Sequence, residues 1–140
     1  MKAPLSAFNA LLLLLLALLH FYWAMGGKWG FDAVLPTNEK GERVMNPKIK
    51  DSILVAFGLS FFSIYYLMHG GWLAIALPPW LFNSGIWIIS GLFLLRSIGD
   101  FKYVGMTKKV KNTAFASNDN RWFIPICLII GLIGVIILTL

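Results

Sequence analysis

Charged residues are scarce in this sequence, and three long stretches contain none. Only 13% of the 140 residues are charged, whereas 59% are hydrophobic and the mean hydropathy is +0.77. A soluble domain carries about 25% charged residues, so the composition excludes a soluble globular domain. Lys, Arg, Asp and Glu are absent from residues 3–27, 52–95 and 122–140. These gaps indicate an integral membrane protein, and the length predicts a single domain over residues 1–140.

The uncharged stretches predict four membrane-spanning helices. A helix needs about 20 apolar residues to cross a bilayer core of about 30 Å. The first and third stretches fit one crossing each, and the middle one is interrupted by Gly70-Gly71 and Pro78-Pro79. We therefore expect an all-α four-helix transmembrane bundle with spans at about 4–25, 48–69, 79–98 and 121–139. A cleaved signal peptide is the alternative for the first span, but its apolar run extends through residues 21–23 and no small-x-small site closes it.

The basic residues predict the orientation of the bundle. The connections 26–47 and 99–120 face one side, and that side with its helix ends holds all of the 12 basic residues except Lys2. The positive-inside rule places this side in the cytoplasm and both termini outside. The two connections would form a small cytoplasmic cap. In the first connection, the β-capable runs 34–37 and 42–45 around a polar turn predict a short β-hairpin.

The sequence lacks the residues that disulfide, haem, metal and ion-transport chemistry require. Cys127 is the single cysteine, which excludes an internal disulfide and a CxxC redox pair. Of the two histidines, His20 lies near the inner face of the membrane and His69 at the outer face, so one haem iron cannot bind both. No cluster has metal-ligand spacing, and we expect neither a metal nor a cofactor. Because no ionisable residue lies deep in any span, an ion pump or ion-coupled transporter is not expected.

Small and weakly polar residues share one face of each expected span. They are Ser6, Asn9, Ala17 and His20; Ser52, Ala56, Ser63 and Tyr66; Asn83, Trp87, Ser90 and Gly91; and Asn120, Cys127, Gly131 and Gly134. Such stripes allow close approach and hydrogen bonding between membrane helices. We expect them to form the seam of the bundle, with a ligand cavity along the same seam as the alternative. Either way, the leucine-rich face of the first span should meet lipid.

The densest group of strongly polar and aromatic residues lies at the cytoplasmic boundary. The residues of this candidate ligand site are His20, Trp23, Trp29, Asp32, Arg96, Asp100 and Tyr103. Arg96 and Asp100 have i,i+4 spacing, and we expect Arg96 to pair with Asp100 or Asp32. One interpretation is a snorkelling arginine with a solvated partner; the other is an anion or headgroup clamp. If Trp87 marks the seam of its helix, Arg96 would point away from the seam.

The sequence pI of about 9.7 follows from the excess of basic residues. The positive-inside bias accounts for this excess, so nucleic-acid binding is not expected. The lysines of the second connection should instead meet anionic lipid headgroups, each contributing about 1 kcal/mol. They are Lys102, Lys108, Lys109 and Lys111. Membrane lipids are thus the expected partners, and a second copy of the chain or another membrane protein stays open.

Three blocks of the sequence are distinctive. They are residues 20–24, 26–27 and 29–30 with Asp32 and residues 35–37, then residues 96–105, and then residues 113–116 with Asp119 and residues 125–128. Together they resemble a bacterial family of small four-span membrane proteins of unknown function. The resemblance implies a bacterial inner-membrane location and carries over no catalytic or binding residue. The size is also similar to the four-span glutathione-transferase and eicosanoid-enzyme family, but the Glu/Arg/Asn-rich motif of its second span is absent.

Two kinds of function remain open at this point. In the first, the protein binds a small amphipathic or lipid-like molecule at the cytoplasmic membrane face, or acts on one as a small membrane enzyme. In the second, it is a structural or accessory membrane protein without a ligand site. An open pocket that reaches the headgroup level and is faced by at least one donor would favour the first; ion pairs that close on one another and leave no cavity would favour the second.

Overall fold

The computed structural model describes residues 1–140 and contains four helices that are long and apolar enough to cross a membrane. The first three are α1 (Lys2–Ala24), α2 (Ile49–His69) and α3 (Pro79–Ile98). The fourth is a continuous segment made of α4 (Ala114–Asn118), the π-helical turn η2 (Asp119–Phe123) and α5 (Ile124–Thr139). A 3-10 turn, η1 (Asp32–Val34), lies in the first long connection. The predicted all-α, four-span architecture is confirmed.

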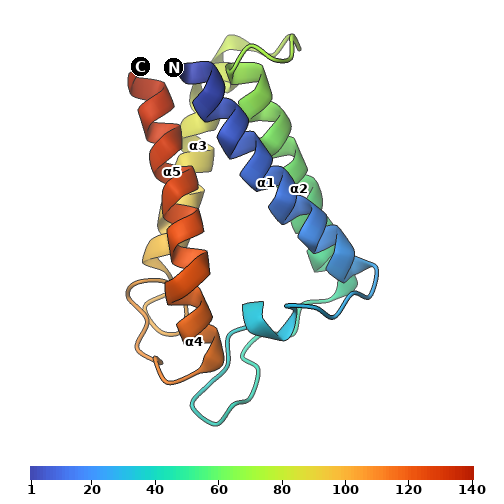
Figure 1. The fold of residues 1–140 in the computed structure, drawn as a ribbon, viewed down its shortest axis with the longest axis vertical. Helices are drawn as coiled ribbons and strands as arrows, with labels where there is room; N and C mark the ends of the chain where they lie inside the picture. The colour runs from blue at the N-terminus through green and yellow to red at the C-terminus, as the bar shows by residue number, and fades with distance from the viewer.

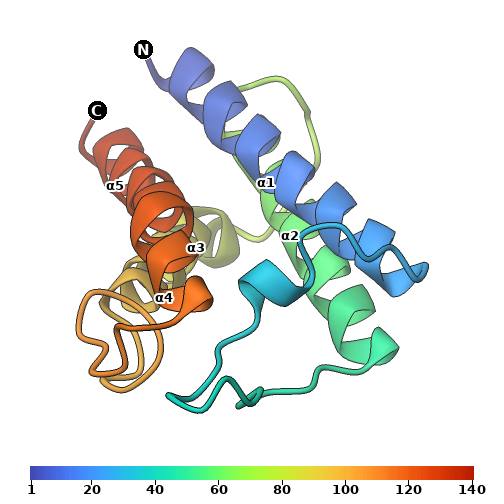
Figure 2. The same cartoon turned by 60° about the horizontal axis from the view of Figure 1, so that its bottom comes forward.

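The helices form two pairs that diverge toward one end of the molecule (Figure 1). One pair is α1 with α2, and the other is α3 with α5. We call the end that holds both termini and the connection 70–78 the terminal end, and the opposite end the loop end. Figure 2 shows the two pairs separated at the loop end, with the first long connection running between them. The two pairs contact each other less than the helices within each pair do. The contacts between the pairs lie toward the terminal end, where α1 approaches α5 and α2 approaches α3.

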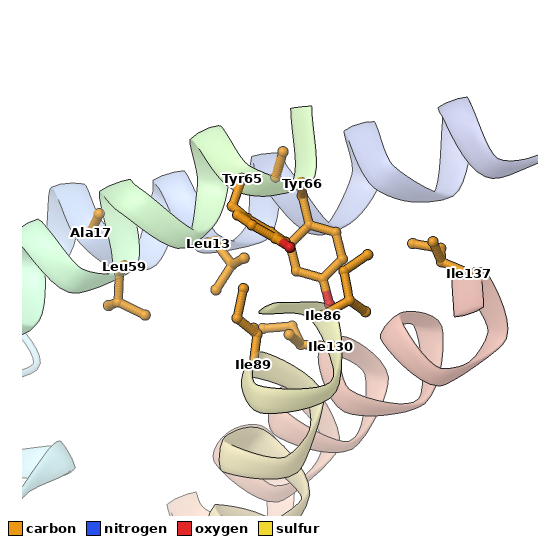
Figure 3. Packing of buried hydrophobic residues seen from close by; sticks show 10 residues of the cluster. Leu13, Ala17, Leu59, Tyr65, Tyr66, Ile86, Ile89, Ile130 and Ile137 are labelled. Atoms are coloured by element: carbon orange, nitrogen blue, oxygen red, sulfur yellow. The ribbon is translucent and has the colours of Figure 1, made fainter. Parts of the chain in front are cut away.

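The buried core lies where the two pairs meet (Figure 3). Tyr66, Ile86 and Ile130, each fully buried, bring three helices together there. The Asn9 side-chain amide donates a hydrogen bond to the Ile130 carbonyl oxygen across the pairs, at 3.0 Å. Within the first pair, the Ser63 hydroxyl donates to the Ala10 carbonyl oxygen at 2.7 Å. Interhelical hydrogen bonds of this kind stabilise association where lipid gives no hydrophobic drive.

The expected seam is found on three of the four spans. Its buried members are Ser6, Asn9 and Ala17 on α1; Ser52, Ala56, Ser63 and Tyr66 on α2; and Cys127, Gly131 and Gly134 on α5. The leucines on the opposite face of α1, such as Leu11 and Leu18, are exposed as expected.

The seam predicted for the third span is wrong except at Ser90. Asn83 is exposed, and Trp87 is 58% exposed, so this face of α3 points out of the bundle. The buried face instead contains Gly85 and Ile89. The cause is Tyr65 of α2, whose phenol occupies the space that a side chain at Gly85 would fill. On the last span, Asn120 is likewise exposed.

The connections differ from the expectation in two places. Instead of a β-hairpin, the first connection has one isolated antiparallel bridge between Thr37 and Arg43. Pro36 has no N–H to donate, which limits regular pairing there. The fourth helix begins at Ala114 rather than near residue 121. Thr113 is its N-cap, because the Thr113 hydroxyl oxygen accepts a hydrogen bond from the Ala116 N–H at 3.0 Å.

Candidate binding cleft between the helix pairs

The divergence of the two pairs leaves a cleft of about 460 Å³ at the loop end. Of its 18 lining residues, 13 are hydrophobic. The walls come from all four long helices: Leu16, His20 and Trp23 from α1; Val55 and Leu59 from α2; Phe93 and Arg96 from α3; and Ile126 and Cys127 from α5. The first connection contributes Phe31, Val34, Leu35, Met45 and Pro47. The cleft is thus an apolar space with a few polar groups on its walls.

Arg96 is the one basic side chain on the cleft wall. It belongs to the last turn of α3, on the same side as Gly85 and Ile89. Because that side is the buried one, Arg96 faces inward, contrary to what the Trp87 seam implied. One guanidinium nitrogen, Nη2, donates to Asp119 Oδ1 at 3.0 Å. The other, Nη1, is buried and has no hydrogen-bond partner.

Asp119 is fully buried and joins three segments of the chain. In addition to its ion pair with Arg96, the Asp119 carboxylate accepts a hydrogen bond from the Gly105 N–H at 2.8 Å. It also forms an ion pair with Lys108 Nζ at 3.1 Å. Lys108 is only 4% exposed, and its ammonium also donates to the Gly105 carbonyl oxygen and to Asn120 Oδ1. These contacts hold the second connection against the ends of α3 and α5.

The π-helical turn explains why Asp119 points into the protein. Pro125 has no N–H and its ring crowds the carbonyl of Arg121, four residues earlier, so a regular α-helix is disfavoured there. The chain widens into the η2 turn, and the Ile124 N–H bonds to the Asp119 carbonyl oxygen five residues back. Such π turns are frequent at functional sites. Here the turn places Asp119 beneath Arg96 and brings Phe123 to the cleft.

Asp100 does not pair with Arg96, and this expectation is wrong. Helix α3 ends at Ile98, and Gly99 has φ +91°, so the chain leaves the helix before an i,i+4 contact can form. One oxygen of the exposed Asp100 carboxylate accepts the backbone N–H groups of Lys102, Tyr103 and Val104. Partial burial raises the pKa of Asp100, but the hydrogen bonds together lower it by more. Its pKa therefore lies below the ordinary value.

Asp32 also has a different partner from the one expected. It forms an exposed ion pair with Arg43, outside the cleft. The pair lies beside a separate surface depression of about 330 Å³ that Gly27 and Lys28 also line. The Arg43 guanidinium also lies over the Phe31 ring. These contacts of Arg43 stay within the first connection and do not reach α3.

The predicted site residues therefore divide into two sets. His20, Trp23 and Arg96 line the cleft together. Trp29, Asp32, Asp100 and Tyr103 do not line it. Trp29 is exposed, although its carbonyl oxygen accepts a hydrogen bond from the Trp23 indole at 2.8 Å. His20 Nδ1 lies 2.7 Å from the Leu16 carbonyl oxygen, to which it can only donate, and the ring packs edge-on against Trp23.

Among the predicted headgroup-binding lysines, Lys102, Lys109 and Lys111 are exposed. The assignment of Lys108 to this group is wrong, because its ammonium is buried and fully engaged by Gly105, Asp119 and Asn120. The Lys108–Asp119 pair is also the part of the site that sequence reasoning missed.

A protein-family model matches most of the chain. The model of the family described as "Protein of unknown function (DUF3995)" matches residues 13–134. The chain belongs to this family. The matched region contains every residue of the cleft and of the Arg96–Asp119–Lys108 cluster. No curated protein and no solved structure matches the chain.

Proposed function

We propose that this DUF3995 protein binds one amphipathic molecule of the membrane, whose apolar part lies in the cleft between the helix pairs. The observation that supports it most is the cleft itself, about 460 Å³ of apolar-walled space. Protein interiors are close-packed and leave few voids larger than a water molecule. Ligand sites, by contrast, are apolar clefts of about 300–1,000 Å³ with a few placed polar groups.

The position of the cleft along the bundle supports an amphipathic ligand. All charged residues except Lys2 fall within residues 28–51 and 96–121, which make up the loop end. The cleft lies just inside this charged layer, between helices long enough to span a membrane. A molecule with an apolar chain and a polar head would match both surroundings at once.

The proposed location is the bacterial inner membrane, with the loop end in the cytoplasm and both termini outside. The basic residues of the loop end support this orientation through the positive-inside rule. Exposed Lys102, Lys109 and Lys111 would then face anionic lipid headgroups. The ligand would enter from the inner leaflet.

The test is native mass spectrometry of the protein extracted gently from the membrane. We expect wild type to carry a co-purifying lipid-like molecule. Val55→Trp combined with Ile126→Trp narrows the cleft from two walls and should remove the bound mass. The matched control is Leu54→Trp with Ile129→Trp, on the exposed faces of the same helices, and it should retain the bound mass. Wild type without a bound molecule, or equal retention in both variants, would favour a structural or accessory role instead.

A further inference from the structure

We infer, on the basis of the proposed amphiphile binding, that the cleft selects molecules with an anionic headgroup, a carboxylate or a phosphate, which the free side of the Arg96 guanidinium binds. Asp119 and Lys108 act as positioning residues that hold Arg96 in place. Three observations carry this inference: the hydrogen bonds of the cluster, its net charge, and the place of Arg96 on the cleft wall.

The hydrogen bonds of the cluster leave one strong donor unused. Lys108 Nζ has three protons, and three acceptors surround it: the Gly105 carbonyl oxygen, Asp119 Oδ2 and Asn120 Oδ1. Both oxygens of Asp119 are occupied, by Arg96 on one side and by Gly105 and Lys108 on the other. Within the Arg96–Asp119–Lys108 cluster, Arg96 Nη1 is the one buried side-chain atom without a partner. A buried donor that stays unpaired is costly, so a ligand that accepts from Nη1 gains that free energy.

The charge of the cluster favours an anion over a neutral acceptor. Arg96 and Lys108 are cations, and Asp119 is the single carboxylate that contacts them, so the cluster carries one uncompensated positive charge. Asp51 is the one acidic side chain on the cleft lining; it accepts the Lys48 N–H at the start of α2 and forms no ion pair with Arg96. A partly buried charge is expensive unless it is paired, and the planar guanidinium suits the geometry of carboxylates and phosphates.

The place of Arg96 on α3 fixes how an amphiphile would lie. Phe93 precedes Arg96 by three residues, so the two share a face of the helix, and both line the cleft. Because α3 runs from the terminal end to the loop end, Phe93 lies deeper in the bundle than Arg96. A headgroup at Arg96 therefore directs its apolar chain toward Phe93 and Leu59. His20 uses its Nδ1–H on the Leu16 carbonyl oxygen.

The test uses three probes with the same sixteen-carbon chain: palmitate, its neutral methyl ester, and palmitoyl lysophosphatidylglycerol. Native mass spectrometry of the detergent-purified full chain measures the retained fraction of each. We expect wild type to retain at least one anionic probe about tenfold more than the methyl ester. A preference for palmitate would identify the ligand as a free fatty acid, and a preference for the lysolipid would identify a ligand with a phosphate headgroup.

The Arg96→Gln variant should lower retention of the anionic probe about tenfold and leave retention of the ester unchanged. Arg96→Lys, which keeps the charge but not the planar fork, should restore part of the difference. Arg43→Gln is the matched control, since Arg43 is an exposed loop-end arginine paired with Asp32, and it should behave as wild type. A general loss of fold would lower retention of all probes equally, so the ratio of anion to ester is the decisive quantity.

Two results would overturn the inference. One is equal retention of palmitate, lysolipid and methyl ester by the wild-type protein. This result does not depend on whether any variant folds. The other is an Arg96→Gln variant with an unchanged anion-to-ester ratio. Failure of the proposed function is a different result, in which wild type retains none of the three probes.

Discussion

Arg96 and Asp119 lie 23 residues apart in the sequence, and their side chains form an ion pair with 3.0 Å between Nη2 and Oδ1. The pair joins the end of α3 to the π-helical turn that precedes α5. Arg96 also lines the apolar cleft, and its remaining guanidinium nitrogen has no hydrogen-bond partner. The stability of the loop end and the chemistry of the cleft therefore depend on the same two residues.

Replacement of the buried carboxylate should destabilise the protein strongly. In Asp119→Asn, Arg96 and Lys108 would share a buried site without a compensating charge. Removing one partner of a buried ion pair costs about 3–5 kcal/mol. Thermal unfolding in detergent should show a clear loss, whereas Asp32→Asn, at an exposed ion pair, should cost no more than about 1 kcal/mol. Similar melting temperatures for the two variants would contradict the role of Asp119.

A bulky residue on the glycine face of α5 should also destabilise the protein. A Cβ at Gly131 would lie 2.7 Å from the Leu94 side chain and 3.2 Å from the Ser90 carbonyl oxygen. We expect Gly131→Leu to cost about 1–3 kcal/mol through overpacking of the α3–α5 contact. Gly58→Leu is the control, because nothing lies within 4 Å of a Cβ built there. An unchanged melting temperature for Gly131→Leu would show that this face of α5 does not pack tightly.

The orientation of the bundle can be checked by cysteine labelling in intact cells. In a Cys127→Ala background, new cysteines at Lys40 and Lys109 should resist a membrane-impermeant thiol reagent, and one at Leu140 should react. The physical reason is the concentration of basic residues at the loop end. The reverse pattern would place the loop end outside the cell.

The connection that follows α3 should keep its structure to unusually low pH. Its three N–H donors lower the pKa of Asp100, so the stability that this carboxylate adds is present above its unfolded pKa and is lost only as the pH falls through the lower folded value. The amide resonances of Lys102, Tyr103 and Val104 should therefore titrate at a lower pH than those of a peptide spanning residues 99–105. A midpoint equal to that of the peptide would show that Asp100 does not hold this loop.

The sequence predicts the helices well because each depends on local composition. Uncharged stretches interrupted by Gly70-Gly71 and Pro78-Pro79 are enough to place four spans. Polarity alone predicts that Trp87 and Asn83 of α3 belong to the seam, whereas both are exposed in the structure. The deciding contact is Tyr65 of α2 against Gly85 of α3, and periodicity does not encode which face of one helix meets another.

The cleft could be predicted only in part, for similar reasons. His20, Trp23 and Arg96 were selected because they lie at one boundary, and they do line one space. The partner of Arg96 was missed, because an i,i+4 rule holds only where the helix continues, and α3 ends at Ile98. Asp119 lies just before the expected start of the fourth span at about residue 121. A signal was nevertheless present: Pro125 lies within two turns of Asp119, and a proline at this distance can turn an acidic residue inward through a π turn.

Photo-crosslinking shows directly whether an amphiphile occupies the cleft between the helix pairs. A fatty acid with a diazirine near the end of its chain is incorporated with the purified protein in lipid nanodiscs, and labelled peptides are located by mass spectrometry. We expect saturable labelling of cleft-wall residues such as Leu59, Phe93 and Ile126. Labelling that does not saturate and falls instead on the lipid-exposed residues Leu11, Leu18 and Leu54 would contradict it.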